Sequence, residues 1–319
     1  MKRIPAILIV LLLIATIFAG CELSKTPAEK SDKISVVTTI FPPYDFTRAI
    51  ADDKADITML LPPGSESHTF EPTAKDMTKI QNCDVFIYVG GESDAWVERI
   101  LDSFEDKSKI KIITLIDCVE AFEEEIVDGM QDVEEDPEED PEEHEYDEHV
   151  WTSPQNAKLI VEKISAALCD VDAKNTALYK QNTKNYLAKL DELDAKFQAV
   201  VDKAVRKTLV FGDRFPFRYF TEAYGLTYFA AFPGCASETE ASPGTIRFLI
   251  DKIKAEKIPV IFHIEMSNEK IAETISEATG TKVRLLHACH NISQADFAAG
   301  RTYLEIMTEN VDVLKEALW

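Results

Sequence analysis

The chain has 319 residues, of which 45% are hydrophobic and 29% are charged, so it holds enough apolar material for about two domains with packed cores. That composition excludes a disordered or collagen-like chain. The formal net charge is −23, which argues against a nucleic acid partner because phosphate contacts need a basic patch. Between Glu120 and Glu148 there are 17 acidic residues, and no Lys or Arg occurs from Ile112 to Ala157, so most of the charge belongs to one segment.

The N-terminus has the pattern of an export signal. Lys2 and Arg3 precede an apolar run, Ile4–Phe18, which is short for a membrane-spanning helix and typical of a signal peptide. Cys21 follows Ala-Gly directly, as in a bacterial lipobox, which predicts a signal over residues 1–20 and a lipidated Cys21. A plain signal peptide or anchor helix with an incidental cysteine is the alternative. Residues 21–33 are polar and predicted to be a tether from the cell membrane.

The N-terminal half alternates short apolar runs with helical segments. Predicted strands cover residues 34–40, 57–61, 84–89 and 110–116. Predicted helices cover residues 44–51, 73–82 and 95–103. This alternation is typical of βαβ units with a parallel sheet, and it predicts an N-terminal α/β lobe over residues 34–170.

An acidic segment, residues 120–148, interrupts that lobe. Its charge density and shortage of apolar residues predict a disordered loop. Ordered structure is expected to resume at His149, because Ser153 is a good helix cap and Pro154 suits the first helical position. That helix is expected to reach about Leu168.

A longer helix is predicted from about residue 172 to residue 205. Its apolar side chains recur at spacings of three and four residues, which indicates one packed face. We assign residues 171–206 to this linking helix and expect it to act as a stiff strut.

The C-terminal half, residues 207–319, returns to the α/β pattern. Predicted strands cover residues 208–212, 226–232, 259–264 and 282–287. Predicted helices cover residues 217–224, 243–256 and 269–279, with a helical segment from residue 294 onwards. The expected fold class is α/β, with two lobes that each hold a mostly parallel sheet flanked by helices, bridged by a long rigid helix.

The cysteines give a weaker indication. Apart from Cys21 there are five, an odd number without a CxxC spacing, so a zinc ribbon is not indicated. An exported protein can oxidise cysteine pairs, and Cys235 with Cys289 is one candidate pair. Buried thiols are the other interpretation.

Histidines are the strongest candidates for binding chemistry. His68 follows the strand 57–61, His287 ends the strand 282–287, and His149 precedes a helix start. Ligands of open α/β sheets bind beyond the carboxyl ends of strands, and imidazoles are good ligands for zinc. A single histidine is more often structural than a ligand, but three from both lobes would clamp a metal between them.

Several stretches carry a resemblance to a known family. They read LLPPGSESHTFEPTAKDMTKIQNCDVFIYVGGESDAWV, DEHVWTSPQNA, RYFTEAYGL, ETEASPGTI and EKIAETISEATGTKV. From about Ile34 to its C-terminus the chain is similar to the lipid-anchored solute-binding proteins of zinc and manganese ABC importers. The resemblance implies two α/β lobes bridged by a long helix, and metal ligands at His68 and His149. It also implies Zn²⁺ as cargo with Mn²⁺ as the second choice, and a permease with its ATPase as partners of a monomeric protein without enzymatic activity.

The chain departs from that family at its third ligand. Where the family usually has a His or Glu, about ten residues before Tyr-Gly-Leu, this chain has Arg214, which stays protonated and cannot bind a cation. We therefore predict that His287, near the family's fourth position, replaces the lost imidazole, and that Arg214 orients a carboxylate or holds an anion. The next candidates for the remaining position are Glu240, Glu265 and His290.

The acidic segment matches the position of a His-rich acidic loop in many zinc-binding members of the family, but it has only His144. It is either a solvated segment without a binding role or a segment that binds divalent cations weakly near the metal site. Carboxylates alone suit hard cations better than zinc, so little metal specificity is expected of it.

Three other functions compete with metal transport. A metal hydrolase would need an open coordination position and a general base, and no HExxH or GxSxG motif is present. A lipoprotein for another solute, such as an anionic iron chelate, would give Arg214 a ligand. Adhesion is a third function, for which the sequence has no motif.

Overall fold

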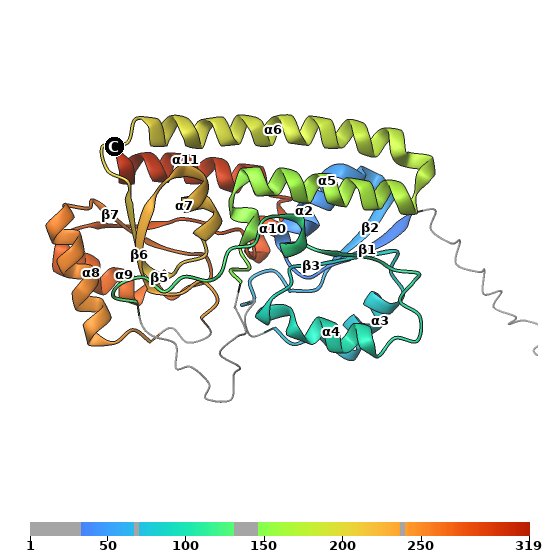
Figure 1. Cartoon of the computed structure of the whole chain (residues 1–319), viewed down its shortest axis with the longest axis horizontal. Coiled ribbons are helices and arrows are strands. Elements are labelled where there is room, and N and C mark those ends of the chain that lie inside the picture. The colour runs from blue at the N-terminus through green and yellow to red at the C-terminus, as the bar shows by residue number, and fades with distance from the viewer. Residues whose placement is uncertain (1–32, 67–69, 131–145, 237–239) are drawn as a thin grey trace, which may run out of the picture. The chain divides into compact units, whose positions relative to one another are not determined.

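The computed structural model describes residues 33–66, 70–130, 146–236 and 240–319, and these residues contain two sheets (Figure 1). The first sheet has the order β2–β1–β3–β4 and the second β6–β5–β7–β8. The first comprises β1 (Ile34–Thr38), β2 (Ala55–Met59), β3 (Val85–Tyr88) and β4 (Lys111–Thr114). The second comprises β5 (Thr208–Arg214), β6 (Thr227–Phe232), β7 (Val260–His263) and β8 (Lys282–Leu285). Every neighbouring pair of strands is parallel, which confirms the predicted α/β fold class.

Helices connect the strands in both halves. In the first half they are α2 (Phe41–Ala51), α3 (Ala74–Gln81), α4 (Ala95–Asp102) and α5 (Pro154–Val171). The long α6 (Thr176–Asp202) leads to α7 (Arg218–Tyr224), α8 (Pro243–Glu256), α9 (Lys270–Thr279), α10 (Gln294–Ala298) and α11 (Tyr303–Leu318).

Local sequence signals account for several helix starts. The Ser153 hydroxyl accepts the backbone N–H of Asn156 and Pro154 opens α5, as predicted. Ser242 caps α8 in the same way, by accepting from Thr245 at 3.1 Å. The predicted start of α2 is wrong: the helix begins at Phe41 rather than Tyr44, because prolines fit the first helical turn, where their missing N–H is not needed.

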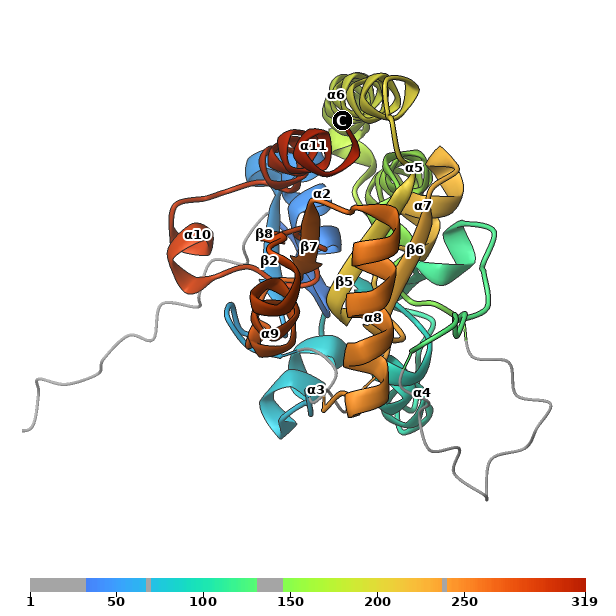
Figure 2. The ribbon, with the colours of Figure 1, turned by 90° about the vertical axis from the view of Figure 1, so that its left-hand side faces the viewer.

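The 27-residue α6 is the linking element. At 1.5 Å per residue it is about 40 Å long. It packs on α5 and α2 of the first half and on α11 of the second, and Figures 1 and 2 both show it beside α11. Its buried side chains include Tyr186, Leu190 and Phe197, which belong to the predicted apolar stripe.

The two sheets share one apolar core instead of having wholly separate ones. A single cluster of buried side chains includes Val36 of β1, Leu190 of α6, Phe211 of β5 and Tyr303 of α11. Each sheet also packs against one smaller cluster, which includes Val37 and Phe86 in the first sheet and Val210 and Ile261 in the second. Because the shared cluster joins both sheets to α6, burial of apolar surface holds the lobes together.

The two ends of the acidic segment are ordered, so the prediction of a fully disordered loop is wrong for residues 120–130 and 146–148. The Tyr219 hydroxyl of α7 accepts the backbone N–H of Phe122 at 3.1 Å and donates to the Asp147 carbonyl at 2.8 Å. The Tyr228 hydroxyl of β6 donates to Glu125 at 3.0 Å. Segment 120–130 therefore docks on the C-terminal lobe, although it follows the last strand of the N-terminal one.

The described cysteines, Cys83, Cys118, Cys169, Cys235 and Cys289, all have free thiols, so the candidate pair is not bonded. Among the described helices, none combines the length and the apolar character needed to cross a membrane. The predicted signal peptide, the lipidation site at Cys21 and the predicted tether up to residue 32 lie outside the described residues.

Candidate metal centre

His149 lies in the short segment that leads into α5. Its side chain is buried, and its Nδ1 is 3.1 Å from the Asp147 carboxylate. The same carboxylate oxygen accepts the backbone N–H of His149 at 2.8 Å. A carboxylate beside Nδ1 favours the tautomer that carries its lone pair on Nε2, which is the arrangement found behind metal-bound histidines.

His290 meets His149 from the C-terminal lobe. The two ring centroids are 5.1 Å apart and the rings are nearly perpendicular. Glu265, just after β7, sets the position of His290, because its carboxylate accepts the backbone N–H groups of Ala288 at 2.7 Å and of His290 at 2.8 Å. The residue between these two, Cys289, has φ +61°, so the backbone turns tightly there.

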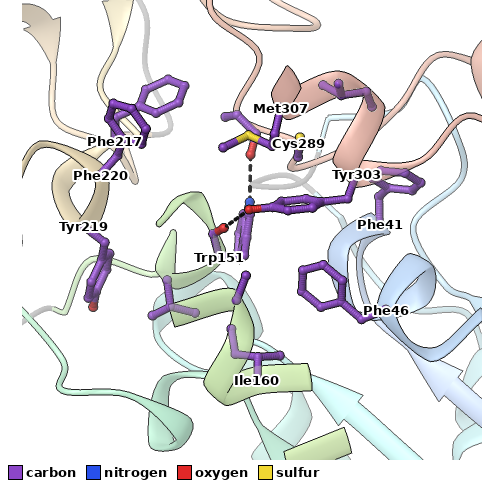
Figure 3. Close-up of a cluster of buried hydrophobic side chains, with 14 of the residues drawn as sticks. Phe41, Phe46, Trp151, Ile160, Phe217, Tyr219, Phe220, Cys289, Tyr303 and Met307 are labelled. Atoms are coloured by element: carbon purple, nitrogen blue, oxygen red, sulfur yellow. Dashed lines mark hydrogen bonds between the residues drawn. The ribbon is translucent and has the colours of Figure 1, made fainter. Parts of the chain in front are cut away.

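The indole ring of Trp151 packs against the imidazoles of both His149 and His290. Its ring centroid is 5.6 Å from that of His149 and 5.0 Å from that of His290. Figure 3 shows its two backbone ties: the Trp151 Nε1–H donates to the Ala288 carbonyl at 2.7 Å, and the Tyr303 hydroxyl donates to the Trp151 carbonyl at 2.7 Å. Trp151 was not among the predicted site residues, although it stands in the DEHVWTSP motif.

A small cavity of about 20 Å³ lies beside the two imidazoles. Such a volume holds one water molecule or one ion rather than an organic solute. Its lining residues are Ser65, Glu66, His149, Arg214, Ile264, Glu265, Met266, His290 and Asn291. The wall therefore combines residues of both lobes with two imidazoles and two carboxylates.

Arg214 is in this wall but faces a carboxylate. Its Nη1 and Nη2 donate to the two oxygens of Glu66 at 3.3 and 3.0 Å, and Nη1 also donates to the Ala236 carbonyl at 3.2 Å. Arg214 therefore contacts a carboxylate, and its role in the site stays a prediction.

His287 is not part of the cavity wall. Its Nδ1 accepts the backbone N–H of Cys289 at 2.9 Å, and the Glu265 carboxylate is 3.4 Å from the same nitrogen. The lone pair on Nδ1 is therefore engaged by a backbone N–H group. The geometry favours a structural role for His287, which stabilises the turn that carries His290.

The other candidate metal ligands are either exposed or outside the described residues. Glu240 is exposed and does not line the cavity. His68 and His144 lie outside the described residues. Within the described ranges, no group of three or more His, Cys, Asp or Glu side chains is arranged to hold a metal ion.

The site is acidic and buried. Burial lowers the pKa of His149, but the carboxylates of Asp147, Glu148 and Glu124 outweigh that effect and raise it above its ordinary value. Burial raises the pKa of Glu148 to about 7 and also raises that of Glu124. The site therefore attracts positive charge, and protons compete with a metal for His149.

Comparison with known proteins places the chain in a family. The model of the family described as ZnuA, zinc-uptake complex component A periplasmic, matches residues 36–317. The chain belongs to the ZnuA family. The high-affinity zinc uptake system protein ZnuA of Bacillus subtilis is 33% identical over 305 residues, which cover 94% of this chain and 93% of that protein. The family consists of solute-binding components of transporters, so the hydrolase alternative is rejected.

Solved structures of ZnuA-family proteins have the same fold. The metal-dependent lipoprotein YcdH of Bacillus subtilis is 30% identical with a TM-score of 0.75, over 90% of this chain and 99% of that one. Zn(II)-bound AdcA of Streptococcus pneumoniae is 30% identical with a TM-score of 0.73, over 90% of this chain. The chain spans 58% of the length of the AdcA chain.

Proposed function

We propose that the chain is the extracytoplasmic solute-binding component of a metal ABC importer, with Zn²⁺ as its cargo and Mn²⁺ as the second choice. The observation that carries the proposal is the pair His149 and His290, which come from different lobes and meet at a cavity of about 20 Å³. Their ring nitrogens are ligands that zinc prefers. Membership of a zinc-uptake family supports the same cargo.

The ligand set we propose is His68, His149 and His290. His68 enters from the family resemblance alone, and His290 takes the place first given to His287. Glu265 either completes the set or acts by holding the backbone of His290, to which it is hydrogen-bonded at 2.8 Å. The metal-loaded protein would pass zinc to a membrane permease that a cytoplasmic ATPase drives, and lipidated Cys21 would keep it at the cell membrane.

An anionic metal chelate remains the second candidate because Arg214 lies in the cavity wall. Two observations make it the weaker one. Arg214 already has a bidentate carboxylate partner, and the cavity has room for an ion rather than a chelate.

Alanine substitutions test the ligand set. His149→Ala and His290→Ala should each weaken zinc binding by roughly a hundredfold or more, because loss of an outer-shell partner alone typically costs 10–100-fold. His263→Ala, at the end of β7, removes an imidazole that does not line the cavity, so it is the control and should bind like the unaltered protein. The measurement is competitive titration of zinc against a chromophoric chelator.

His287→Ala decides between the two assignments in the C-terminal lobe. A structural role predicts a smaller loss of affinity than His290→Ala produces. If His287→Ala abolished zinc binding while His290→Ala left it intact, His287 would be the ligand and His290 would not.

A further inference from the structure

Arg214 forms a charged contact between the lobes at the wall of the cavity. Its side chain, at the end of β5, is 8% exposed, and both Nη groups donate to the carboxylate of Glu66. A paired arginine–carboxylate contact of this kind is stronger and more directional than a single hydrogen bond. Glu66 belongs to the N-terminal lobe, in the segment that follows β2.

The segment around Glu66 is also held by the loop that follows His290. The Asn291 side-chain amide donates to the carbonyls of Pro62 at 2.9 Å and Ser65 at 2.7 Å. The backbone N–H of Gly64 donates to the Ile292 carbonyl at 2.8 Å. Residues 62–66 are therefore fixed to the C-terminal lobe by three hydrogen bonds and one ion pair, all of them between protein groups.

The charge of Arg214 would otherwise oppose metal binding. A guanidinium cannot lose its proton at neutral pH, so its positive charge stays beside the cavity. Two like charges a few ångströms apart repel strongly where water is excluded. The Glu66 carboxylate cancels that charge, so the pair as a whole is compatible with a divalent cation.

We infer that Arg214 and Glu66 are a positioning pair that fixes segment 62–66 of the N-terminal lobe to the C-terminal lobe through protein groups alone and keeps the cavity wall electrically neutral there. The inference rests on the proposed metal-binding function. The family that the chain resembles usually has a metal-binding histidine or glutamate at the position of Arg214. In this chain the Arg214–Glu66 ion pair joins the two lobes at that position. The metal would then bind to the imidazoles of His149 and His290 in the same wall.

Two kinds of variant separate the mechanical role from the electrostatic one. Glu66→Gln breaks the ion pair and leaves the Arg214 charge uncompensated. The double variant Glu66→Gln, Arg214→Met breaks the pair but removes both charges. Asp251→Asn is the matched control, because Asp251 is an exposed carboxylate on α8 that pairs with Arg247 at 3.9 Å.

Hydrogen exchange of the Gly64 amide in the metal-free full chain reports the mechanical role. We expect Glu66→Gln and the double variant each to speed this exchange by about tenfold, since the cross-lobe hydrogen bond opens more often when its neighbouring ion pair is lost. The control should not change it. Unchanged exchange in both variants would overturn the positioning role.

Zinc titration reports the electrostatic role. Glu66→Gln should weaken zinc binding by about tenfold, and the double variant should recover most of that loss, because it has no uncompensated charge. Arg214→Lys should speed Gly64 exchange but keep zinc affinity within about threefold, because lysine keeps the charge and loses the paired geometry. Equal zinc affinity in Glu66→Gln and the control would overturn this role.

The outcomes also separate this inference from the proposed function. If exchange responded as expected but the unaltered protein bound no zinc, the proposed function would fail while the mechanical role of the pair stood. If the unaltered protein bound zinc but no variant changed exchange or affinity, the proposed function would stand and the positioning pair would fail.

Discussion

Asp147 and Glu265 are carboxylates that each accept hydrogen bonds from one of the two histidines of the site. Asp147 contacts the ring and the backbone of His149, and Glu265 accepts the backbone N–H of His290. Each histidine is therefore oriented by a buried carboxylate from its own lobe. Support of this kind is what a metal ligand needs in order to bind without a large entropic cost.

The choice between His287 and His290 shows where sequence reasoning stopped. Both residues follow β8 and are three positions apart, so strand-end placement favours them equally. The turn at Cys289, with φ +61°, and the backbone contacts of Glu265 place the ring of His290 against His149. A positive φ at a cysteine has no sequence signal, so this part of the site could not be predicted.

Asp94 is a buried carboxyl that should make stability depend on pH. It accepts the backbone N–H groups of Val89 at 2.7 Å and Gly90 at 3.3 Å, yet burial raises its pKa from 3.8 to about 6. The folded protein thus keeps a proton that the unfolded chain releases, and the free energy of unfolding falls as pH rises from about 4 to about 6.

Asp94→Asn removes that titration and can keep the hydrogen bonds through its amide oxygen. Relative to the unaltered protein, the variant should gain about 2–3 kcal/mol of unfolding free energy between pH 4 and pH 7. Urea unfolding at both pH values measures the difference. A constant difference between the two proteins across this range would show that Asp94 titrates normally.

At the scale of the elements, the strands and helices were largely predictable because apolar runs and caps determine them. All eight predicted strands are present, and α5 and α8 begin at the predicted serine caps. The docking of segment 120–130 was not predictable. Its contacts use backbone groups and the hydroxyls of Tyr219 and Tyr228, which leave no periodic pattern in an acidic sequence.

The linking helix α6 should depend on its buried face for stability. Leu190 is fully buried in the core shared by both sheets, so Leu190→Ala should lower the free energy of unfolding by about 2–5 kcal/mol. The matched control is Leu159→Ala on α5, where the leucine is 46% exposed and the loss should be under about 0.5 kcal/mol. Urea unfolding of both variants measures this. Similar losses in the two would mean that α6 contributes little packing energy.

At the scale of the whole molecule, the net charge of −23 is concentrated at one place in the fold. The ordered ends of the acidic segment dock on the C-terminal lobe, and its last residues, Asp147 and Glu148, adjoin His149. Composition predicted an acidic protein unsuited to nucleic acid. Only the fold shows that part of this acidity surrounds the candidate metal site.

The most direct test of metal capture is a crystal structure of the zinc-loaded protein with anomalous diffraction at the zinc absorption edge. The expected result is one strong peak between the lobes, about 2.0–2.1 Å from a ring nitrogen of His149 and of His290. A peak bound by His287 instead would contradict the ligand assignment. A peak elsewhere, or none at equimolar zinc, would contradict the proposed function.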